Sequence, residues 1–337
     1  MKKYFGVLPS GETASLYTLS CGALSASVTD YGATLVSLLV PDAQGALADV
    51  VLGHDDCNGY RLGTGCIGAT VGRNANRTQG ASFCLGDAAC RLGVNDNGNN
   101  LHSGPDFFFH RLWSVASVTD CSIIFTLESP SGDQGFPGNA RIFVTYTLEN
   151  DGLRVRYDAV SDRDTVFNMT NHSYFNLAGH EKTDAAMDQL LTLPGRWFNP
   201  DDGENIPTGE KRDVSGTPMD FRAPKALGQD LNADYEPLHL QNGYDHNWEV
   251  YSNPCAILRD PVSGRTLAIT TDCPGIQVYT GNFLNETGKG GVYYGKNSGV
   301  ALETQFAPDC LHHPDWPQPI VKAGEKYHSE TFYRFTW

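Results

Sequence analysis

The chain has 337 residues, of which 40% are hydrophobic and 19% charged, so it can bury a large core and does not resemble a disordered polyelectrolyte. Its formal net charge of -15 would repel phosphate backbones and anionic lipids, which argues against nucleic-acid and membrane partners. The first residues contain no signal-peptide core, and no apolar run reaches the ~18 residues of a membrane helix. We therefore expect a cytoplasmic protein.

Short runs rich in β-branched and aromatic residues predict strands along the chain. In chain order they span residues 122–129, 141–149, 153–160, 266–272, 276–283 and 331–337. The cluster Asn150, Asp151 and Gly152 separates the second run from the third and predicts a hairpin. No long amphipathic helical pattern, fixed-period repeat or low-complexity linker interrupts the chain. The sequence thus predicts an all-β protein whose residues 1–337 form one large antiparallel domain.

The least regular stretch, residues 178–245, is rich in Pro, Gly and Asp. We expect long loops with short strands over one face of the sheet there, and such loops often build functional sites.

Nine cysteines are scattered along the chain without any Cys-X-X-Cys pair, which argues against a zinc knuckle or a redox motif. We expect most of them to be buried, reduced thiols.

Reactive and recognition side chains gather in five short segments beside turn residues or strand ends. These are GRNANR (72–77), NNLHSG (99–104), TNHSYFNLAG (170–179), NGYDHNW (242–248) and SGVALETQFAPD (298–309). Taken alone, His102 or His172 is more often a structural histidine than a catalyst. Glu303 is more informative, because it lies in an apolar run typical of a buried strand, and a buried carboxylate needs a partner or a task. Two interpretations of Glu303 stay open, a salt bridge to Arg73 or Arg77 and a catalytic role.

Three His-X-carboxylate pairs occur, at 54/56, 313/315 and 328/330, but none has a specific metal-ligand spacing. There is also no glycine-rich phosphate loop, no Gly-X-Ser-X-Gly elbow and no Cys-His signature. We therefore expect neither a metal nor a cofactor. The remaining hydrogen-bonding groups, interleaved with aromatic rings, suit a sugar. They are Asn76, Arg77, His102, His172, Asp245, Gln277 and Glu303, with Tyr174, Trp248 and Phe283.

Taken in order, these segments resemble the aldose 1-epimerase family, the galactose mutarotases. The resemblance extends from DYGATLVSLLVPDAQG (30–45) and DVVLGHDDCNGY (49–60) to AGEKYHSETFYRF (323–335). It implies a galactose mutarotase-like β-sandwich with a sugar cleft on one face. It also implies interconversion of the α and β anomers of free hexoses such as D-galactose and D-glucose, without a cofactor. By position, His172 matches the general acid and Glu303 the general base. The substrate-binding positions match Asn76, Arg77, His102, Tyr174, Asp245 and Gln277.

The chain departs from the family pattern at a few positions. Ser103 stands where glycine is usual, Cys273 replaces a glutamine or similar residue, and the sequence QFAPDC (305–310) differs from the one typical of the family. These departures affect the expected sugar preference more than the reaction. For the acid role, we expect nearby carboxylates such as Asp245 to favour the charged form of His172.

Three alternatives stay open. A hexose-6-phosphate 1-epimerase would need a basic cluster for the phosphate, and none adjoins the motifs. A non-catalytic sugar-binding protein would not need both an acid and a base. A glycosidase would use two carboxylates, whereas the acid candidate here is a histidine.

Overall fold

The computed structural model describes residues 1–337, and strands make up most of its regular structure. Three large sheets, of nine, six and five strands, contain every long strand. Each of the three is antiparallel throughout. The predicted all-β class is therefore confirmed.

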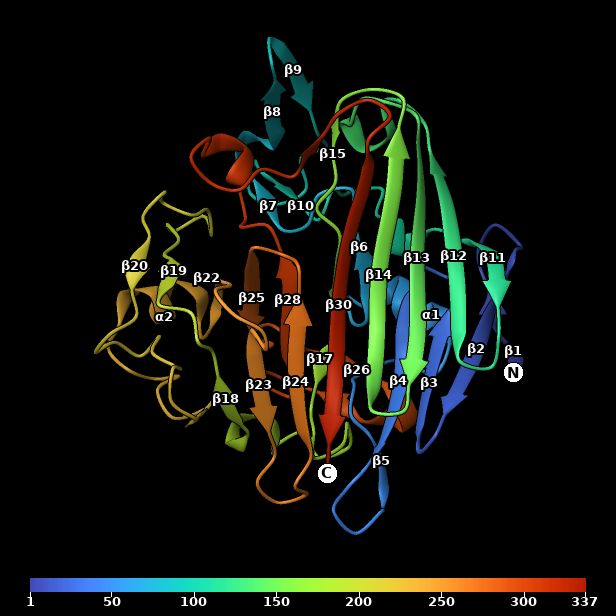
Figure 1. Ribbon diagram of the computed structural model, residues 1–337, viewed down its shortest axis with the longest axis vertical. Helices are drawn as coiled ribbons and strands as arrows, with labels where there is room; N and C mark the ends of the chain where they lie inside the picture. Colours follow the sequence, from blue (N-terminus) through green and yellow to red (C-terminus); the bar gives the residue numbers. More distant parts are fainter.

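Figure 1 looks onto the nine-stranded sheet. Its strands, in spatial order, are β11 (Ser114–Val118), β12 (Ser122–Ser129), β13 (Ala140–Glu149), β14 (Gly152–Ser161), β30 (Lys326–Thr336), β24 (Thr266–Thr271), β23 (Ala256–Arg259), β18 (Leu190–Thr192) and β21 (Lys225–Ala226). The last strand of the chain, β30, lies between β14 and β24 and joins the two halves of the sheet.

The hairpin of β13 and β14 forms as predicted. Glu149 pairs with Gly152, so Asn150 and Asp151 form a two-residue turn. Along β14, Val155, Tyr157 and Ala159 are buried while the residues between them are more exposed, which is the period of two that the sequence shows.

The other two large sheets lie behind the first in the view of Figure 1. The five-stranded sheet consists of β1 (Lys2–Val7), β2 (Thr13–Cys21), β3 (Leu24–Thr29), β4 (Thr34–Pro41) and β5 (Leu47–Asp49). The six-stranded sheet has the order β17 (Tyr174–Phe175), β28 (Val300–Gln305), β25 (Gly275–Tyr279), β22 (Asp245–Glu249), β19 (Trp197–Asn199) and β20 (Arg212–Asp213).

The remaining elements are short. Five strand pairs are β6 (Ala69–Val71) with β16 (Thr170–His172), β7 (Arg77–Thr78) with β10 (Asn100–Leu101), β8 (Ser82–Leu85) with β9 (Ala88–Arg91), β15 (Thr165–Val166) with β29 (Ile320–Val321), and β26 (Glu286–Thr287) with β27 (Tyr293–Tyr294). The two α-helices are α1 (Cys57–Leu62) and α2 (Glu236–Gln241). Neither helix is long and apolar enough to cross a membrane.

One hydrophobic cluster of 50 buried residues lies between the large sheets. It draws side chains from all three of them, for example Leu24, Tyr157 and Leu302. The sheets therefore pack face to face as a sandwich, in agreement with the predicted architecture. Trp248, expected among the sugar-facing aromatics, is 1% exposed and belongs to this core, because its neighbours Asn247 and Glu249 take the opposite face of β22.

Two strands differ from the expected runs by more than one residue at an end. The run 276–283 forms a strand only to Tyr279, because Gly281 adopts a left-handed φ of 63° and turns the chain. The strand that contains the run 331–337 begins earlier, at Lys326. The preceding residues continue the alternation, because Tyr327 and Ser329 are buried and the residues beside them are more exposed.

The stretch 178–245 consists of loops and short strands, as expected, but α2 within it was not predicted. Its strands also extend the edges of the nine- and six-stranded sheets, so the expectation that they cover one face is wrong. All nine cysteines are free thiols, and five are buried: Cys57, Cys90, Cys255, Cys273 and Cys310.

Candidate active site

A cavity of about 290 Å³ brings most of the sequence-predicted residues together. This volume is close to the lower end of the range for small-molecule sites, roughly 300 Å³. Seven of the eight predicted residues line it: Asn76, Arg77, His102, His172, Tyr174, Asp245 and Glu303. Five distant segments of the chain thus converge on one site.

The six-stranded sheet positions Glu303. On β28 the buried Val300 and Leu302 belong to the core between the sheets, so Glu303 faces the opposite side. There Glu303 is in register with Gln277 on β25, which is in register with Asn247 on β22. Asn199 on β19 continues this row of polar side chains.

Glu303 contacts His172 and no arginine. Its Oε1 lies 3.6 Å from His172 Nε2, and the two side chains are 2% and 7% exposed. A salt bridge of Glu303 to Arg73 or Arg77 is therefore wrong, because Arg73 binds carbonyl and hydroxyl groups elsewhere and Arg77 pairs with Asp96. Glu303 Oε2 and His172 Nδ1 have no protein partner at all.

Burial favours the neutral form of both groups. It lowers the pKa of His172 to about 4. Burial, helped by the negative charge of Asp245, holds the pKa of Glu303 well above its ordinary value. The expectation that Asp245 and other carboxylates favour the charged form of His172 is thus wrong for the unliganded site, because burial lowers the pKa of His172 instead.

His102 presents a defined tautomer to the cavity. Its Nδ1 accepts a hydrogen bond of 3.1 Å from the backbone N–H of Asn76, so the proton is on Nε2. Burial and the neighbouring His172 and Arg77 lower its pKa well below the ordinary value, which keeps the ring neutral. The ring lies 5.5 Å from that of His172, centroid to centroid. His102 can therefore donate one hydrogen bond from Nε2.

The guanidinium of Arg77 pairs with the carboxylate of Asp96. Its Nε donates to Asp96 Oδ2 at 2.7 Å, which leaves the two terminal nitrogens without a partner in the protein. The preceding Asn76 has a φ of 62°, and its Oδ1 accepts the backbone N–H of Arg77 at 2.8 Å. This turn directs both side chains to the cavity.

Asp245, Gln277 and Tyr174 have supporting contacts. Gln277 does not line the cavity; its Nε2 donates to Asp245 Oδ1 at 2.7 Å and so orients that carboxylate. The hydroxyl of Tyr174 donates to the carbonyl of Gly65 at 2.9 Å, so the tyrosine contributes its ring face to the cavity wall. That ring lies 5.0 Å from the ring of His172.

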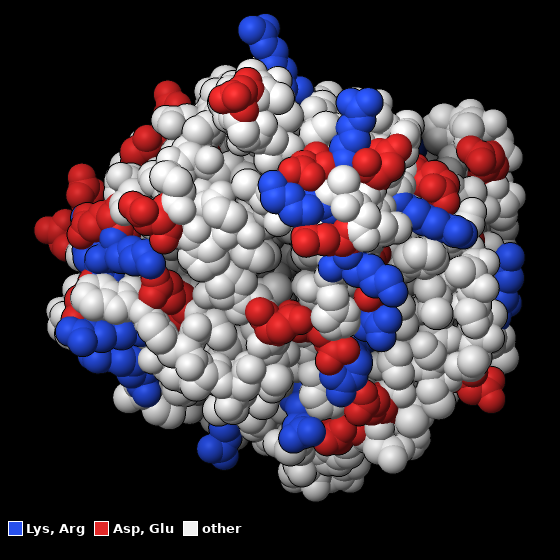
Figure 2. All heavy atoms as spheres, turned by 45° about the horizontal axis from the view of Figure 1, so that its top comes forward, with Lys and Arg blue, Asp and Glu red and all other residues white.

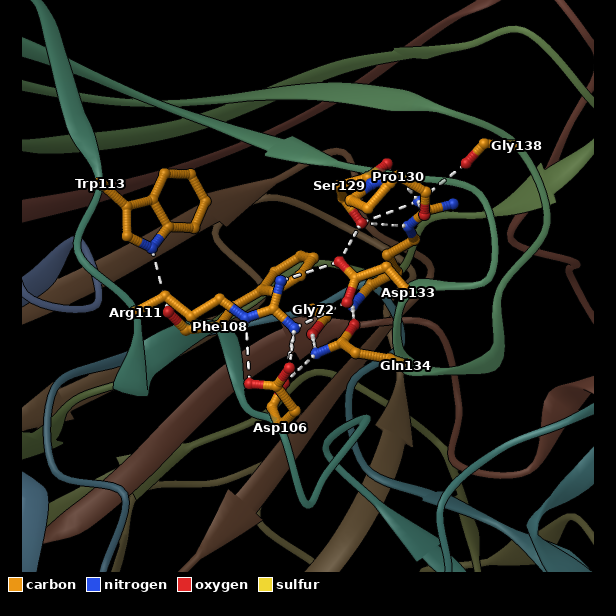
Figure 3. A network of polar contacts seen from close by, with 11 residues as sticks. Gly72, Asp106, Phe108, Arg111, Trp113, Ser129, Pro130, Asp133, Gln134 and Gly138 are labelled. Carbon is orange, nitrogen blue, oxygen red and sulfur yellow. Dashed lines mark hydrogen bonds and ion pairs between the residues drawn. The ribbon is translucent and has the colours of Figure 1, made fainter.

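A partly buried polar network anchors the segment that leads to Asn76 and Arg77. Figure 3 shows the Gln134 amide bound to the carbonyl of Gly72, and Arg111 between Asp106 and Asp133. The next residue, Arg73, is fully buried and donates to Ser129, Pro137, Gly138 and Thr165. Burial lowers the pKa of its guanidinium to about 10.

With this geometry in view, the comparison with known proteins is decisive. The family model "Aldose 1-epimerase" matches residues 15–334. The chain belongs to the aldose 1-epimerase family. Galactose mutarotase from Bos taurus is 39% identical over 339 residues, which cover 98% of this chain and 97% of that one. Aldose 1-epimerase from Haemophilus influenzae is 37% identical over 336 residues, covering 97% of each chain.

Solved structures agree with this membership. An aldose epimerase homologue from C. elegans has a TM-score of 0.88 at 30% identity and covers 96% of this chain and 99% of its own. Galactose 1-epimerase from Lactobacillus acidophilus has a TM-score of 0.87 at 27% identity, with coverages of 100% and 98%. The protein is thus an isomerase with a galactose mutarotase-like fold.

Sequence reasoning missed several residues that line this cavity. Tyr279 lines the cavity, and it lies two residues after Gln277 on β25, so the period of the strand could have placed it on the same face. Cys66, with a φ of 53°, lines it too, and burial raises the pKa of its thiol to about 12. No pattern in its glycine-rich surroundings indicates this position. Leu284 lines the cavity as well, next to Phe283, which the sequence indicated among the aromatics suited to a sugar and which is 64% exposed.

The departures from the family pattern do not remove a cavity group. Ser103 has a φ of 60°, where glycine is usual, and its Oγ both accepts from the N–H and donates to the carbonyl of Asn74, each at 2.9 Å. These bonds tie the turn of His102 to the segment of Asn76. Cys273 is buried beside Ser329 and does not line the cavity.

The charged surface is mixed. Figure 2 shows Lys and Arg side chains next to Asp and Glu across the face it presents, with no area of basic residues alone. No group of three or more His, Cys, Asp and Glu side chains has an arrangement that could hold a metal ion. Metal independence remains a prediction, which exhaustive chelation would test.

Proposed function

We propose that this protein interconverts the α and β anomers of free aldohexoses such as D-galactose and D-glucose, as a single-domain cytoplasmic enzyme that needs no cofactor. The observation that carries the proposal is the contact of Glu303 with His172 inside a cavity ringed by hydrogen-bonding groups. A base and an acid in contact with the same bound molecule are what ring opening requires.

In the proposed reaction, Glu303 takes the proton of the C1 hydroxyl while His172 protonates the ring oxygen. The C1–O5 bond breaks and the open-chain aldehyde forms. Rotation about C1–C2 presents the other carbonyl face, and the same groups then act in reverse to close the ring as the opposite anomer. No covalent intermediate forms.

The charge states of the pair fit this sequence. Ring opening begins with an anionic Glu303 and a cationic His172 and ends with both neutral. The neutral state is the one that burial favours, as the two pKa shifts indicate. The cavity would therefore stabilise the charge distribution of the open-chain intermediate. Between the ring-closed complex and the open-chain intermediate, Glu303 gains the C1 hydroxyl proton and His172 gives its proton to the ring oxygen. The pair therefore carries one proton in both states.

His102 and Arg77 would bind oxygen atoms of the sugar. His102 offers an N–H from its Nε2, and Arg77 offers its terminal nitrogens. Both donors can stabilise negative charge that develops on a sugar oxygen during bond breaking, and in a water-poor site such donors are effective. Asp245, oriented by Gln277, supplies an acceptor for sugar hydroxyls.

Polarimetry tests the proposal directly. Freshly dissolved α-D-galactose changes its optical rotation slowly in buffer, and the enzyme should accelerate that change in proportion to its concentration. A folded protein that binds galactose but leaves the spontaneous rate unchanged would support the non-catalytic sugar-binding alternative instead.

The hexose-6-phosphate alternative finds less support. Arg77 is the one Lys or Arg among the residues that line the cavity, and its charge is already compensated by Asp96. A phosphate dianion would enter a site that also contains Asp245 and Glu303.

A further inference from the structure

A second cavity, of about 240 Å³, lies at the edge of the six-stranded sheet. Its floor is the same row of polar side chains that begins at Glu303, because Asn247 and Asn199 both line it. The two cavities share no lining residue. The second one is therefore a separate space, two strands away from Glu303 on the same sheet face.

One residue that lines this cavity has an unpaired buried hydrogen-bond acceptor. Asn247 is 3% exposed; its Nδ2 donates to Asn199 Oδ1 at 2.9 Å, but its Oδ1 has no partner. A buried polar atom without a partner costs about 1–3 kcal/mol, so a ligand that satisfies Asn247 Oδ1 binds favourably.

The walls restrict the chemistry of that ligand. Lys211 and Glu249 are the two charged residues that line the cavity, and they pair with each other at 2.5 Å, so the cavity favours a neutral molecule. Trp316, 8% exposed and stacked on His313, provides an aromatic wall. A hydroxyl donor for Asn247 Oδ1 and a C–H face for the indole are properties of a polyhydroxylated ring.

The chain segment after Glu303 links the two cavities. Ala307 lines the second cavity, and the backbone N–H of Asp309 donates to the carbonyl of Arg77 at 2.9 Å. Ala307 also belongs to the segment 305–310, whose sequence is unusual for the family. Part of the wall of the second cavity is thus formed by a segment that departs from the family pattern.

We propose that this second cavity is a binding site for a neutral polyhydroxylated ring, a monosaccharide or a cyclic polyol, held by Asn247 and Trp316. We assign it no catalytic role, because the one amine and the one carboxylate that line it pair with each other. It does not depend on the function proposed for the first cavity.

The test is a titration of the folded protein with D-galactose and, separately, with myo-inositol, which has no anomeric carbon and cannot mutarotate. The indole N–H signal of Trp316 in an NMR spectrum, assigned with Trp316→Phe, reports the second cavity. We expect a saturable shift of this signal with at least one of the two rings. Absence of any saturable shift with both rings would overturn the proposal.

Two variants and a control locate the binding. Asn247→Leu removes the unpaired acceptor and Ala307→Leu fills the cavity, so both should abolish the Trp316 shift while kcat/KM for mutarotation stays within about twofold. Asn232→Leu makes the same replacement at an exposed residue that lines neither cavity and should leave the shift unchanged. A shift that survives in both folded cavity variants would also overturn the proposal. Failure of the mutarotation assay would leave the Trp316 readout intact, so the two proposals fail separately.

Discussion

At the scale of single residues, the central feature is the pair of Glu303 and His172. The sequence motifs predicted both residues, and the structure brings them into contact. The sequence did not predict their protonation, because that depends on burial by residues distant in the chain. The Nε2–H tautomer of His102 has the same origin, since it follows from a backbone N–H donated by Asn76 across a tertiary contact.

The proposed mechanism predicts a pH profile for kcat/KM with an acid limb and an alkaline limb. In that mechanism the active form carries one proton on the pair, so activity should fall on the acid side as the pair takes up a second proton, near the His172 pKa of about 4. It should fall on the alkaline side as Glu303, whose pKa is raised, loses its proton. Initial mutarotation rates across pH, corrected for the spontaneous reaction, measure both limbs. An acid limb near the ordinary histidine pKa of about 6.5 would contradict the assignment.

At the scale of elements, the period of two predicted the strands well where one face is buried and the other exposed, as in β13 and β14. It also placed Glu303 in a buried strand. The period of two was less informative for short elements such as α2 and β20, because long-range contacts rather than local patterns stabilise them. Long-range contacts also hold the irregular segment of Gly72 and Arg73, where Arg73 donates to acceptors far along the chain, such as Ser129 and Gly138.

The network around Arg111 gives a test of how this segment is held. Asp133, with its side chain 8% exposed, pairs with Arg111 at 2.8 Å, and Asp106, 74% exposed, pairs with the same guanidinium at 2.9 Å. Asp133→Ala leaves a half-buried arginine without its inner partner and should lower the free energy of unfolding by about 3 kcal/mol. Asp106→Ala is the matched control and should cost less than about 1 kcal/mol. Urea unfolding curves measure both, and equal costs would contradict the account.

The same pair should contribute to acid sensitivity. Burial alone would raise the pKa of Asp133, but hydrogen bonds from Arg111 and Ser129 hold it below the ordinary value. Its stabilising contribution is therefore present above the unfolded pKa of about 3.9 and is lost as the pH falls through the lower folded pKa. The difference in unfolding free energy between wild type and Asp133→Ala should shrink only in that acid range.

At the scale of the whole molecule, composition and charge excluded classes of partner but could not identify a substrate. The net charge of -15 disfavours an anionic substrate, and Arg77 is the one Lys or Arg that lines the first cavity. Family membership supplies the reaction class. The shape of the cavity and the existence of a second one could not be predicted, because they arise where loops from several sheets meet.

The acidic cavity predicts discrimination against phosphorylated sugars. The kcat/KM for D-galactose should exceed that for D-galactose 6-phosphate on the order of tenfold or more, because the phosphate would approach Asp245 and Glu303 without a free cation. D-Fucose, which lacks the 6-hydroxyl and has no charge, is the control and should remain a substrate. A higher kcat/KM for the phosphate ester would assign the protein to the hexose-6-phosphate alternative.

The most direct test of the account is the mutarotation rate of folded Glu303→Gln and His172→Asn, measured beside their affinity for D-galactose. Each replacement retains a polar group of similar size but removes proton transfer, so kcat should fall by on the order of 10²-fold or more while affinity changes far less. The double variant should lose much less than the product of the two single losses, because both residues act on one proton-coupled step. Turnover close to wild type in either single variant would contradict the role assigned to that residue and, with it, the proposed mechanism.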